Sequence, residues 1–486
     1  EDYYNIDPRY GTMEDVEELS REAEKRGIRL MFDMVFNHTS DRNQWFQKAL
    51  AGDPKYKDFY IFKKGPKPGV PPTNWESKFG GSAWEYVEKF DEYYLHLFDV
   101  SQPDLNWENP EVRKEVQNVI KFWMGKGIKG FRFDVVNLIS KDKYENDYEG
   151  DGRRFYTDGP NIHKYLRELN EATFGTDAEI ITVGEMSSTT MENCYQYANE
   201  DGKELSMVFS FHHLKVDFMG NEKWVIVPFD FQKLKKILFD WQVNMGKHHA
   251  WNAVFWCNHD QPRVVSRFGN VEKYWKESAK MLGTVIHCLR GTPYIYQGEE
   301  LGMTNAGFTD ISQYKDVESL NHFRILQEKG LTEENAYQIL QIHSRDNSRT
   351  PMQWNSGENG GFTTGEPWIE VNKNCSYINA EAELQDEDSI FHYYQKLIAL
   401  RKEYDVIAYG ELKPLDEKNP SVFAYEREYQ GEKMLVICNF YGKEVTWDSE
   451  TELGEYQCVL SNYEVHNIEG SRIGLKPYEA VVLYKK

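Results

Sequence analysis

Ionisable side chains recur in this 486-residue chain at the ends of short apolar runs. Each run has the length of a buried strand, and helical patterns lie between several of them. In a parallel barrel the carboxyl ends of all strands open on one face, so residues distant in sequence converge there. One Asp at a strand end is most simply a helix N-cap, but several ionisable residues in this position predict a site. They are Asp33, His38, Arg132, Asp134, Glu185, His259 and Asp260, with the polar Asn37 directly before His38.

Three carboxylates on one face suit the retaining hydrolysis of a glycosidic bond. One carboxylate attacks the anomeric carbon, and a second, about 5 Å away, protonates the leaving oxygen. A third can hold the sugar hydroxyls and help to raise the pKa of the second by like-charge repulsion. Aromatic residues make up 15% of the chain, and they suit the stacking of sugar faces, although most would serve large cores.

A small basic patch stands out in a chain of net charge -22. The segment FSFHHLKVDF, residues 209–218, contains His212, His213 and Lys215, and Lys223 follows shortly after it. An ammonium and an imidazolium suit a phosphate and gain little from a neutral sugar. The patch therefore predicts a sugar phosphate as the substrate. The alternative is a solvated surface turn in which His212 or His213 packs into the core.

The elements that would position these residues alternate between helix and strand. Helical patterns at 12–27 and 110–127 each precede an apolar run, an order typical of βα units. Six strands are predicted, at 28–38, 128–136, 179–186, 205–211, 252–260 and 291–300. After a helix at 391–404, short alternating runs predict an all-β domain, with strands at 421–429, 433–440, 456–462 and 479–486.

Charge and composition exclude several classes of partner. The acidic balance argues against a nucleic acid or an anionic membrane surface, since either would require a basic face. No apolar run approaches the length of a membrane span. The six cysteines are widely spaced, so reduced thiols in a cytoplasmic protein are expected, without a zinc site. We expect a monomer that uses no metal and no redox or organic cofactor.

Several short blocks resemble the signature segments of the α-amylase superfamily. The blocks are DMVFNH at 33–38, QPDLNW at 102–107, GFRFDVVN at 130–137, VGEM at 183–186 and NHDQPR at 258–263. The later RDNSRTPMQW, at 345–354, is similar to the oligo-1,6-glucosidase-like branch. The resemblance covers essentially the whole chain.

The resemblance implies a role for each residue that matches a block. Asp134 would be the nucleophile, Glu185 the general acid/base and Asp260 the stabiliser of the transition state. Arg132 would keep Asp134 ionised. The inner glucose would be contacted by His38, His259, Arg345 and Phe98, the last as an aromatic platform. Val135, directly after the nucleophile, is the residue that the branch uses where the linkage is not α-1,4.

Longer segments resemble the members of this branch that act on a phosphorylated α-(1,1)-linked disaccharide. The resemblance implies release of glucose and glucose 6-phosphate with retained anomeric configuration. The phosphate would be held by His212, His213, Lys215 and Lys223. Two alternatives stay open: an oligo-1,6-glucosidase acting on neutral α-glucosides, and a catalytically inactive barrel that serves for binding.

The expected fold is α/β, a (β/α)8 barrel of the TIM type followed by a β-sandwich. The barrel would comprise 1–38 and 94–405, an inserted subdomain B would comprise 39–93, after the third strand of the family barrel, and the sandwich would comprise 406–486. Six predicted strands leave two of eight unaccounted for. We therefore expect the first two βα units of the family, with their aspartate-rich metal loop, to be missing. A barrel without these two units would have an open sheet edge, and such edges are prone to aggregation. We therefore also expect that this chain by itself hydrolyses its substrate slowly or not at all.

Overall fold

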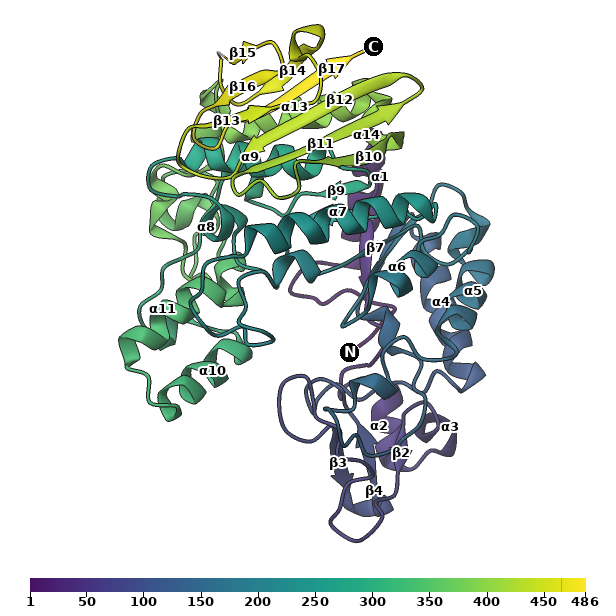
Figure 1. Ribbon diagram of the computed structural model, residues 1–486. Coiled ribbons are helices and arrows are strands. Elements are labelled where there is room, and N and C mark those ends of the chain that lie inside the picture. The colour runs from purple at the N-terminus through teal and green to yellow at the C-terminus, as the bar shows by residue number, and fades with distance from the viewer. Residues whose placement is uncertain (465) are drawn as a thin grey trace. The chain divides into compact units, whose positions relative to one another are not determined.

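The computed structural model describes residues 1–464 and 466–486. The chain forms two compact units (Figure 1). Unit 1 comprises Glu1–Phe211 and Lys247–Asn252, and unit 2 comprises His212–Gly246 and Ala253–Lys486. Each unit contains one group of the parallel strands that were predicted from the sequence.

Unit 1 is built on a four-stranded parallel sheet, in the order β1-β5-β6-β7. The register places Asp33 opposite Arg132 and Arg132 opposite Val183. Phe131, Phe133 and Val183, on the two central strands, are buried, as in a sheet covered on both faces. These strands confirm four of the predicted ones. Their bounds are Met31–Met34 for β1, Gly130–Phe133 for β5, Ile181–Glu185 for β6 and Met207–Phe209 for β7.

Helices of unit 1 begin at the caps that the sequence provides. Thr12 and Asp15 form a capping box at the start of α1, which matches the predicted helix. Asn109 caps α4, and a proline occupies the first turn, where its missing N–H has no consequence. Figure 1 shows α4 and α5 side by side. The bounds are Met13–Lys25 for α1, Pro110–Gly125 for α4, Ile162–Ala172 for α5 and Met191–Tyr197 for α6.

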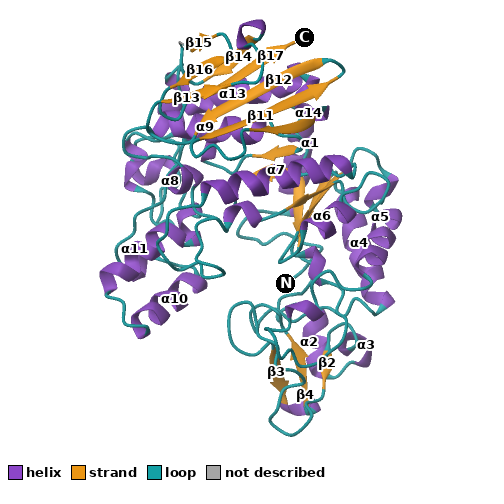
Figure 2. Ribbon diagram, in the orientation of Figure 1, coloured by secondary structure: helices purple, strands orange, loops and turns teal. Residues whose placement is uncertain are grey.

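A small antiparallel sheet, in the order β2-β4-β3, occupies the segment between β1 and α4 (Figure 2). Its core contains Trp75, Trp84 and Leu95, and it also includes Val135 and Leu138 from just after β5. This region therefore supports the segment that follows Asp134. The bounds are Gln44–Ala51 for α2, Pro54–Lys57 for α3, Phe62–Lys63 for β2, Trp84–Val87 for β3 and Glu92–Leu95 for β4.

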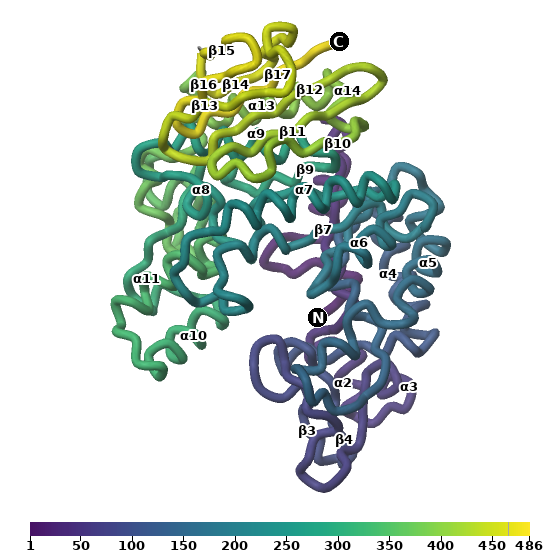
Figure 3. Tube along the Cα trace, viewed as in Figure 1, coloured from purple at the N-terminus to yellow at the C-terminus, as the bar shows by residue number. Residues whose placement is uncertain are grey.

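Unit 1 is completed by the later segment Lys247–Asn252 (Figure 3). The N–H of Trp251 donates to the Ala198 carbonyl at 3.2 Å, and a parallel bridge joins Val208 of β7 to Asn252. The imidazole of His248 stacks on Tyr195, with ring centroids 3.8 Å apart. The segment thus pairs with β7 at Val208.

Unit 2 contains the other two parallel strands, β8 and β9, which pair with each other. Helices α10 and α11 form a hairpin, visible in Figure 3, around a cluster that includes Phe323 and Leu340. The strand bounds are Ala253–Phe255 for β8 and Thr292–Tyr294 for β9. The helix bounds are Phe231–Lys247 for α7, Val264–Phe268 for α8, Trp275–His287 for α9, Val317–Glu328 for α10, Glu333–His343 for α11, Ala380–Gln385 for α12, Ile390–Glu403 for α13 and Asp405–Tyr409 for α14.

The C-terminal part of unit 2 forms two antiparallel sheets, in the orders β10-β11-β12-β17-β14 and β13-β16-β15. Their shared core includes Val422, Ile437, Trp447 and Leu483. This confirms the predicted all-β region. The bounds are Glu411–Leu415 for β10, Val422–Tyr429 for β11, Glu432–Asn439 for β12, Val445–Asp448 for β13, Gln457–Ser461 for β14, Asn467–Glu469 for β15, Arg472–Leu475 for β16 and Ala480–Lys485 for β17.

Candidate active site

Arg132 is the centre of the ionisable cluster in unit 1. Its Nη1 lies 2.7 Å from Asp33 Oδ1 and 2.6 Å from Asp134 Oδ1, and its other nitrogen, Nη2, contacts the carboxylate of Glu185. Burial opposes the charge of Arg132, but Asp33 and Asp134 outweigh it and raise the pKa of the guanidinium. The side chains are 13% exposed at Glu185, 24% at Asp134 and 54% at Asp33, so the two predicted catalytic carboxylates are the more enclosed.

Asp134 and Glu185 are positioned by the carboxyl ends of strands β5 and β6. Asp134 directly follows β5, and its N–H donates to the Met34 carbonyl at 3.0 Å, while Glu185 is the last residue of β6. Val135 is buried and adopts a left-handed conformation, with φ of 35°. A β-branched residue is strained in this conformation, and such strain persists only where the surroundings enforce it. The packing of Val135 against the small-sheet core provides that enforcement.

His38 and Phe98, both predicted to contact sugar, lie together in unit 1. Their ring centroids are 5.1 Å apart, and Gln102 Nε2 lies 3.1 Å from His38 Nε2. On the other side of the ring, Asn37 Nδ2 lies 3.2 Å from His38 Nδ1 and also donates to Asp104 at 3.0 Å. Burial lowers the pKa of His38, against the carboxylates of Asp104 and Asp134, which favours the neutral imidazole.

A buried lysine supports this arrangement. Lys141 Nζ lies 2.8 Å from Asp104 Oδ2 and donates to Asn37 Oδ1 at 2.8 Å. Both charged side chains are almost fully enclosed, at 2% and 0% exposure. Burial lowers the pKa of Lys141, and the ion pair with Asp104 opposes that shift. A buried pair of this kind is expensive to break, because either partner alone would be an uncompensated charge.

In unit 2, Asp260 lies between two arginines. Arg349 Nη2 is 2.6 Å from Asp260 Oδ1, and Arg345 Nη1 is 3.4 Å from the same oxygen. Both arginines also contact Asp316, at 2.5 Å from Arg345 and 3.6 Å from Arg349. His259 Nε2 lies 3.5 Å from Asp260 Oδ2. Unit 2 thus brings together the three predicted residues Asp260, His259 and Arg345.

Lys223 joins this cluster through Glu318. Its Nζ lies 2.9 Å from Glu318 Oε2, and Arg345 Nε lies 3.4 Å from the same oxygen. Burial lowers the pKa of Lys223, and Glu318 opposes that shift. One predicted phosphate ligand is therefore linked by a single carboxylate to a predicted sugar ligand.

Two of the other predicted phosphate ligands, His212 and His213, lie in a short 3-10 turn, His212–Leu214, and Lys215 directly follows it. His213 is buried, and its Nε2 lies 2.8 Å from the Phe255 carbonyl. Burial lowers the pKa of His213 to about 4, so this imidazole is neutral at neutral pH. The half-buried ring of His212 packs against Trp241, with centroids 4.7 Å apart, and Lys215 is exposed.

Several residues that contact the predicted site residues were not predicted from the sequence. Arg349 makes a shorter contact with Asp260 than Arg345 does. Its spacing of four residues from Arg345, in RDNSRTPMQW, is that of one helical turn and could have suggested it. Lys141 and Asp316 were also missed, and no local signal marks either of them.

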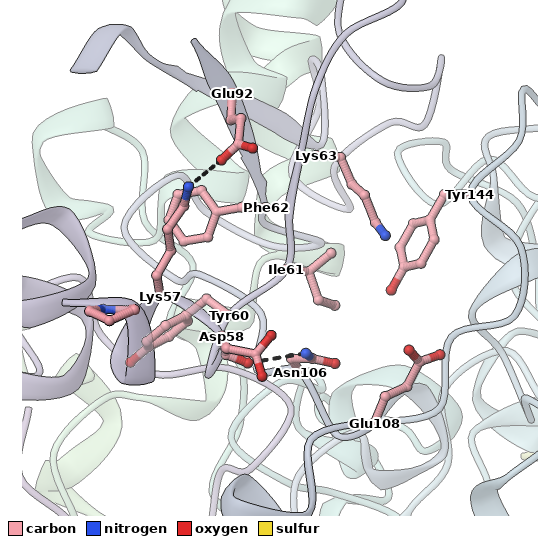
Figure 4. Close-up of a pocket in the computed structure, with 11 residues that line it drawn as sticks. Lys57, Asp58, Tyr60, Ile61, Phe62, Lys63, Glu92, Asn106, Glu108 and Tyr144 are labelled. Atoms are coloured by element: carbon pink, nitrogen blue, oxygen red, sulfur yellow. Dashed lines mark hydrogen bonds and ion pairs between the residues drawn. The ribbon is translucent and has the colours of Figure 1, made fainter. Parts of the chain in front are cut away.

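A cavity of about 360 Å³ lies in unit 1 beside the small sheet (Figure 4). Lys57 forms an ion pair with Glu92 there at 2.5 Å, and Asn106 donates to the Asp58 carbonyl at 3.1 Å. None of the predicted site residues lines it. The lining residues are Pro54, Lys57, Asp58, Tyr60, Ile61, Phe62, Lys63, Glu92, Asn106, Glu108 and Tyr144.

No three or more His, Cys, Asp or Glu side chains of residues 1–464 and 466–486 are arranged to hold a metal ion. No helix within these ranges has the length and apolar content needed to cross a membrane.

Comparison with known proteins was made at the level of families, sequences and structures. A model of the α-amylase catalytic domain matches residues 1–410, and a model of the C-terminal domain of the α-amylase SusG matches residues 422–482. Trehalose-6-phosphate hydrolase of Bacillus subtilis is 56% identical, over 99% of this chain and 86% of that protein. The Escherichia coli enzyme of the same name is 52% identical, over 99% and 87%.

An oligo-1,6-glucosidase is also similar to this chain. Oligo-1,6-glucosidase of Bacillus cereus is 48% identical, over 100% of this chain and 88% of that protein. Among solved structures, trehalose-6-phosphate hydrolase of Bacillus licheniformis has a TM-score of 0.96 at 55% identity, covering 99% of this chain and 88% of that one. The expectation that the first two βα units are missing finds no support here, because the catalytic-domain model matches from residue 1.

The family match, the parallel strands and the carboxylates at their ends agree with one another. The C-terminal match coincides with the two antiparallel sheets. The chain therefore belongs to the α-amylase family, with a (β/α)8 catalytic domain and a C-terminal β-sandwich domain.

Proposed function

We propose that the protein is a retaining glycosidase that hydrolyses trehalose 6-phosphate to glucose and glucose 6-phosphate. The relatives named trehalose-6-phosphate hydrolase, at 52% and 56% identity, support this substrate. The observation that carries the reaction type is the contact of one guanidinium, that of Arg132, with both Asp134 and Glu185. A shared cation holds two carboxylates close together, as a retaining mechanism requires.

In the first step Asp134 attacks the anomeric carbon of the unphosphorylated glucose. The glycosidic bond breaks as Glu185 donates its proton to the leaving oxygen, so glucose 6-phosphate departs as a neutral alcohol at that position. A covalent glucosyl ester on Asp134 remains. Glu185, now a carboxylate, takes a proton from water, and the resulting attack releases glucose with retained configuration.

The local charges support this division of roles. Arg132 contacts the carboxylates of Asp33, Asp134 and Glu185. We assign the transferred proton to Glu185, the least exposed of the three. Asp134, at 2.6 Å from Arg132, is the carboxylate that the cation supports as a nucleophile.

The remaining predicted residues receive binding roles. Asp260, supported by Arg345 and Arg349, would accept hydrogen bonds from sugar hydroxyls and stabilise positive charge in the transition state. The neutral imidazole of His38 and the ring of Phe98 would contact glucose, and His259 is likewise assigned to sugar binding. The division into a barrel of 1–38 and 94–405, a subdomain of 39–93 and a sandwich of 406–486 remains a proposal.

We assign binding of the substrate phosphate to the four basic residues that were predicted from the sequence. Lys215 is exposed and His212 is half-buried, so both side chains are accessible to a ligand. His213 contacts the Phe255 carbonyl and Lys223 contacts Glu318, which supports a role of these two in shaping the site. Each of the four can be substituted separately.

The deciding experiment compares hydrolysis of trehalose 6-phosphate, isomaltose and p-nitrophenyl α-glucoside by the same preparation. We expect preferential release of glucose 6-phosphate, abolished in Asp134→Asn, and initial formation of the α-anomer of glucose. Preference for isomaltose would instead assign the neutral-substrate activity of the Bacillus cereus relative. Activity that persists in Asp134→Asn would refute the proposed nucleophile.

A further inference from the structure

The segments that follow β5 and β6 are joined by the side chain of one asparagine. Asn137 lies three residues after Asp134 and is fully buried. Its Nδ2 donates to the Ser187 carbonyl at 2.8 Å, and its Oδ1 accepts from the Ser187 N–H at 2.8 Å. Ser187 lies two residues after Glu185. We call these two reciprocal hydrogen bonds the Asn137 clamp.

The clamp is itself held in place by Asp158. The Asp158 carboxylate accepts from Asn137 Nδ2 at 3.2 Å, and its N–H donates to the Asn137 carbonyl at 2.9 Å. The same carboxylate accepts from Thr189 at 2.9 Å and from Tyr197 at 2.5 Å. Asp158 therefore ties the segment after β6 to Asn137 a second time.

Backbone strain lies on both sides of the clamp. Val135 and Ser188 adopt left-handed conformations, with φ of 35° and 54°. Residues without a glycine's freedom hold such conformations only where surrounding contacts impose them. The two segments also approach closely, since a Cβ built on Gly184 would lie 3.1 Å from Cγ1 of Val136. Without the clamp, the strained residues would have fewer contacts to keep the two segments in register.

We propose that Asn137 is a positioning residue that sets the separation between the carboxylates of Asp134 and Glu185. The inference rests on the roles proposed above for these two residues. Both carboxylates end their strands, so a shift of either following segment moves one relative to the other. In a retaining glycosidase that separation decides whether attack and protonation can occur in one transition state. A misplacement of about 1 Å can lower the rate roughly 100-fold.

The test substitutes Asn137→Ala and uses two substrates that differ in their need for acid catalysis. Trehalose 6-phosphate has a poor leaving group that must be protonated, whereas dinitrophenolate leaves without a proton. We expect kcat for trehalose 6-phosphate to fall roughly 100-fold with KM nearly unchanged. We expect kcat/KM for 2,4-dinitrophenyl α-glucoside to fall by less than about 10-fold, because this ratio reports only the steps up to formation of the glucosyl ester, in which dinitrophenolate needs no proton from Glu185.

Asn439→Ala is the matched control. Asn439 is also fully buried, and its amide donates to the carbonyls of Lys443 and Lys476 at 2.7 and 2.9 Å in the sandwich. We expect a similar loss of thermal stability with kcat unchanged on both substrates. Asp158→Asn retains the shape of the side chain that supports the clamp and, if Asn137→Ala does not fold, provides the same comparison with a smaller expected loss.

The outcomes separate the clamp from the underlying function. Equal losses on the two substrates, or no loss on either, would overturn the positioning role. If Asp134→Asn and Glu185→Gln remain active on trehalose 6-phosphate, the catalytic roles proposed above fail, and if the unaltered protein does not hydrolyse this substrate, the proposed function itself fails. If those variants are inactive while Asn137→Ala keeps normal kcat on both substrates, only the clamp fails.

Discussion

The two ionisable clusters, one in each unit, differ in their balance of charge. In unit 1 one guanidinium, that of Arg132, contacts three carboxylates. In unit 2 two guanidiniums, those of Arg345 and Arg349, contact Asp260 and Asp316. The first cluster thus has one guanidinium for three carboxylates, and the second has two guanidiniums for two carboxylates. Proton transfer needs a carboxyl group that can gain and lose a proton, whereas a binding carboxylate needs only to stay in place, so the difference matches the proposed roles.

The largest expected effect comes from removing the carboxyl group that would transfer the proton. Glu185→Gln should lower kcat for trehalose 6-phosphate by roughly 10²- to 10⁴-fold, because the leaving oxygen would no longer be protonated. Steady-state kinetics from pH 5 to 9 should also lose the basic limb of the profile. If the basic limb were unchanged, another group would have to donate the proton to the leaving oxygen. The difference in charge balance would then not explain the roles of the two clusters.

The next effect concerns the shared cation of unit 1. Arg132→Met should reduce the free energy of unfolding by about 2 to 3 kcal/mol, since three carboxylates lose their common partner, although Asp33 is half exposed. Arg349→Met should reduce it by only about 1 kcal/mol, because Arg345 still contacts both carboxylates of unit 2. Urea titration measures both values. Equal losses would mean that the charge balance has no bearing on stability.

A third prediction concerns how the stability of unit 2 depends on pH. His213 and His287, both in unit 2, are buried, and burial lowers the pKa of each to about 4. At neutral pH both are uncharged, folded or unfolded. Below about 6.5 the unfolded chain gains protons that the folded chain does not, so stability falls until about pH 4. By pH 5 we expect a loss of about 2 kcal/mol for each histidine.

Substitution isolates this contribution. His287→Gln should flatten the decrease in urea midpoint between pH 7 and pH 5. The control is His249→Asn, an exposed site with φ of 52° that Asn also tolerates, and it should leave the slope unchanged. A slope that is the same in both variants would show that acid sensitivity arises elsewhere.

The smallest expected effect tests the assignment of the phosphate to unit 2. Lys215→Ala should raise KM for trehalose 6-phosphate roughly 5-fold, the loss of one solvent-exposed charged contact, and leave KM for p-nitrophenyl α-glucoside unchanged. Lys233→Ala, an exposed lysine on α7, serves as the control. An equal rise for both substrates would remove Lys215 from the phosphate site.

The residues at strand ends could be predicted from sequence because a strand and its end are local features. GFRF followed by Asp134, and ITVG followed by Glu185, place each carboxyl group by periodicity alone. All six predicted parallel strands are present, and so is the helix at the capping box of Thr12. The fold class followed from this alternation together with the family resemblance.

The partners of those residues could not be predicted in the same way. Lys141 meets Asp104 only because two loops pack against each other, and both residues would be read from sequence as surface charges. His213 and Lys223 were predicted from their charge, whereas their burial and protein partners depend on tertiary packing. The Asn137 clamp uses backbone atoms of Ser187, which carry no sequence signal.

The late return of Lys247–Asn252 to unit 1 has a consequence for synthesis on the ribosome. In the nascent chain, the bridge between Val208 of β7 and Asn252 cannot form until the whole of His212–Gly246 has emerged. Unit 1 therefore cannot complete its sheet cotranslationally before part of unit 2 exists outside the exit tunnel. During that interval an exposed strand edge is available to other chains, so dependence on chaperones should be greatest at this stage of translation.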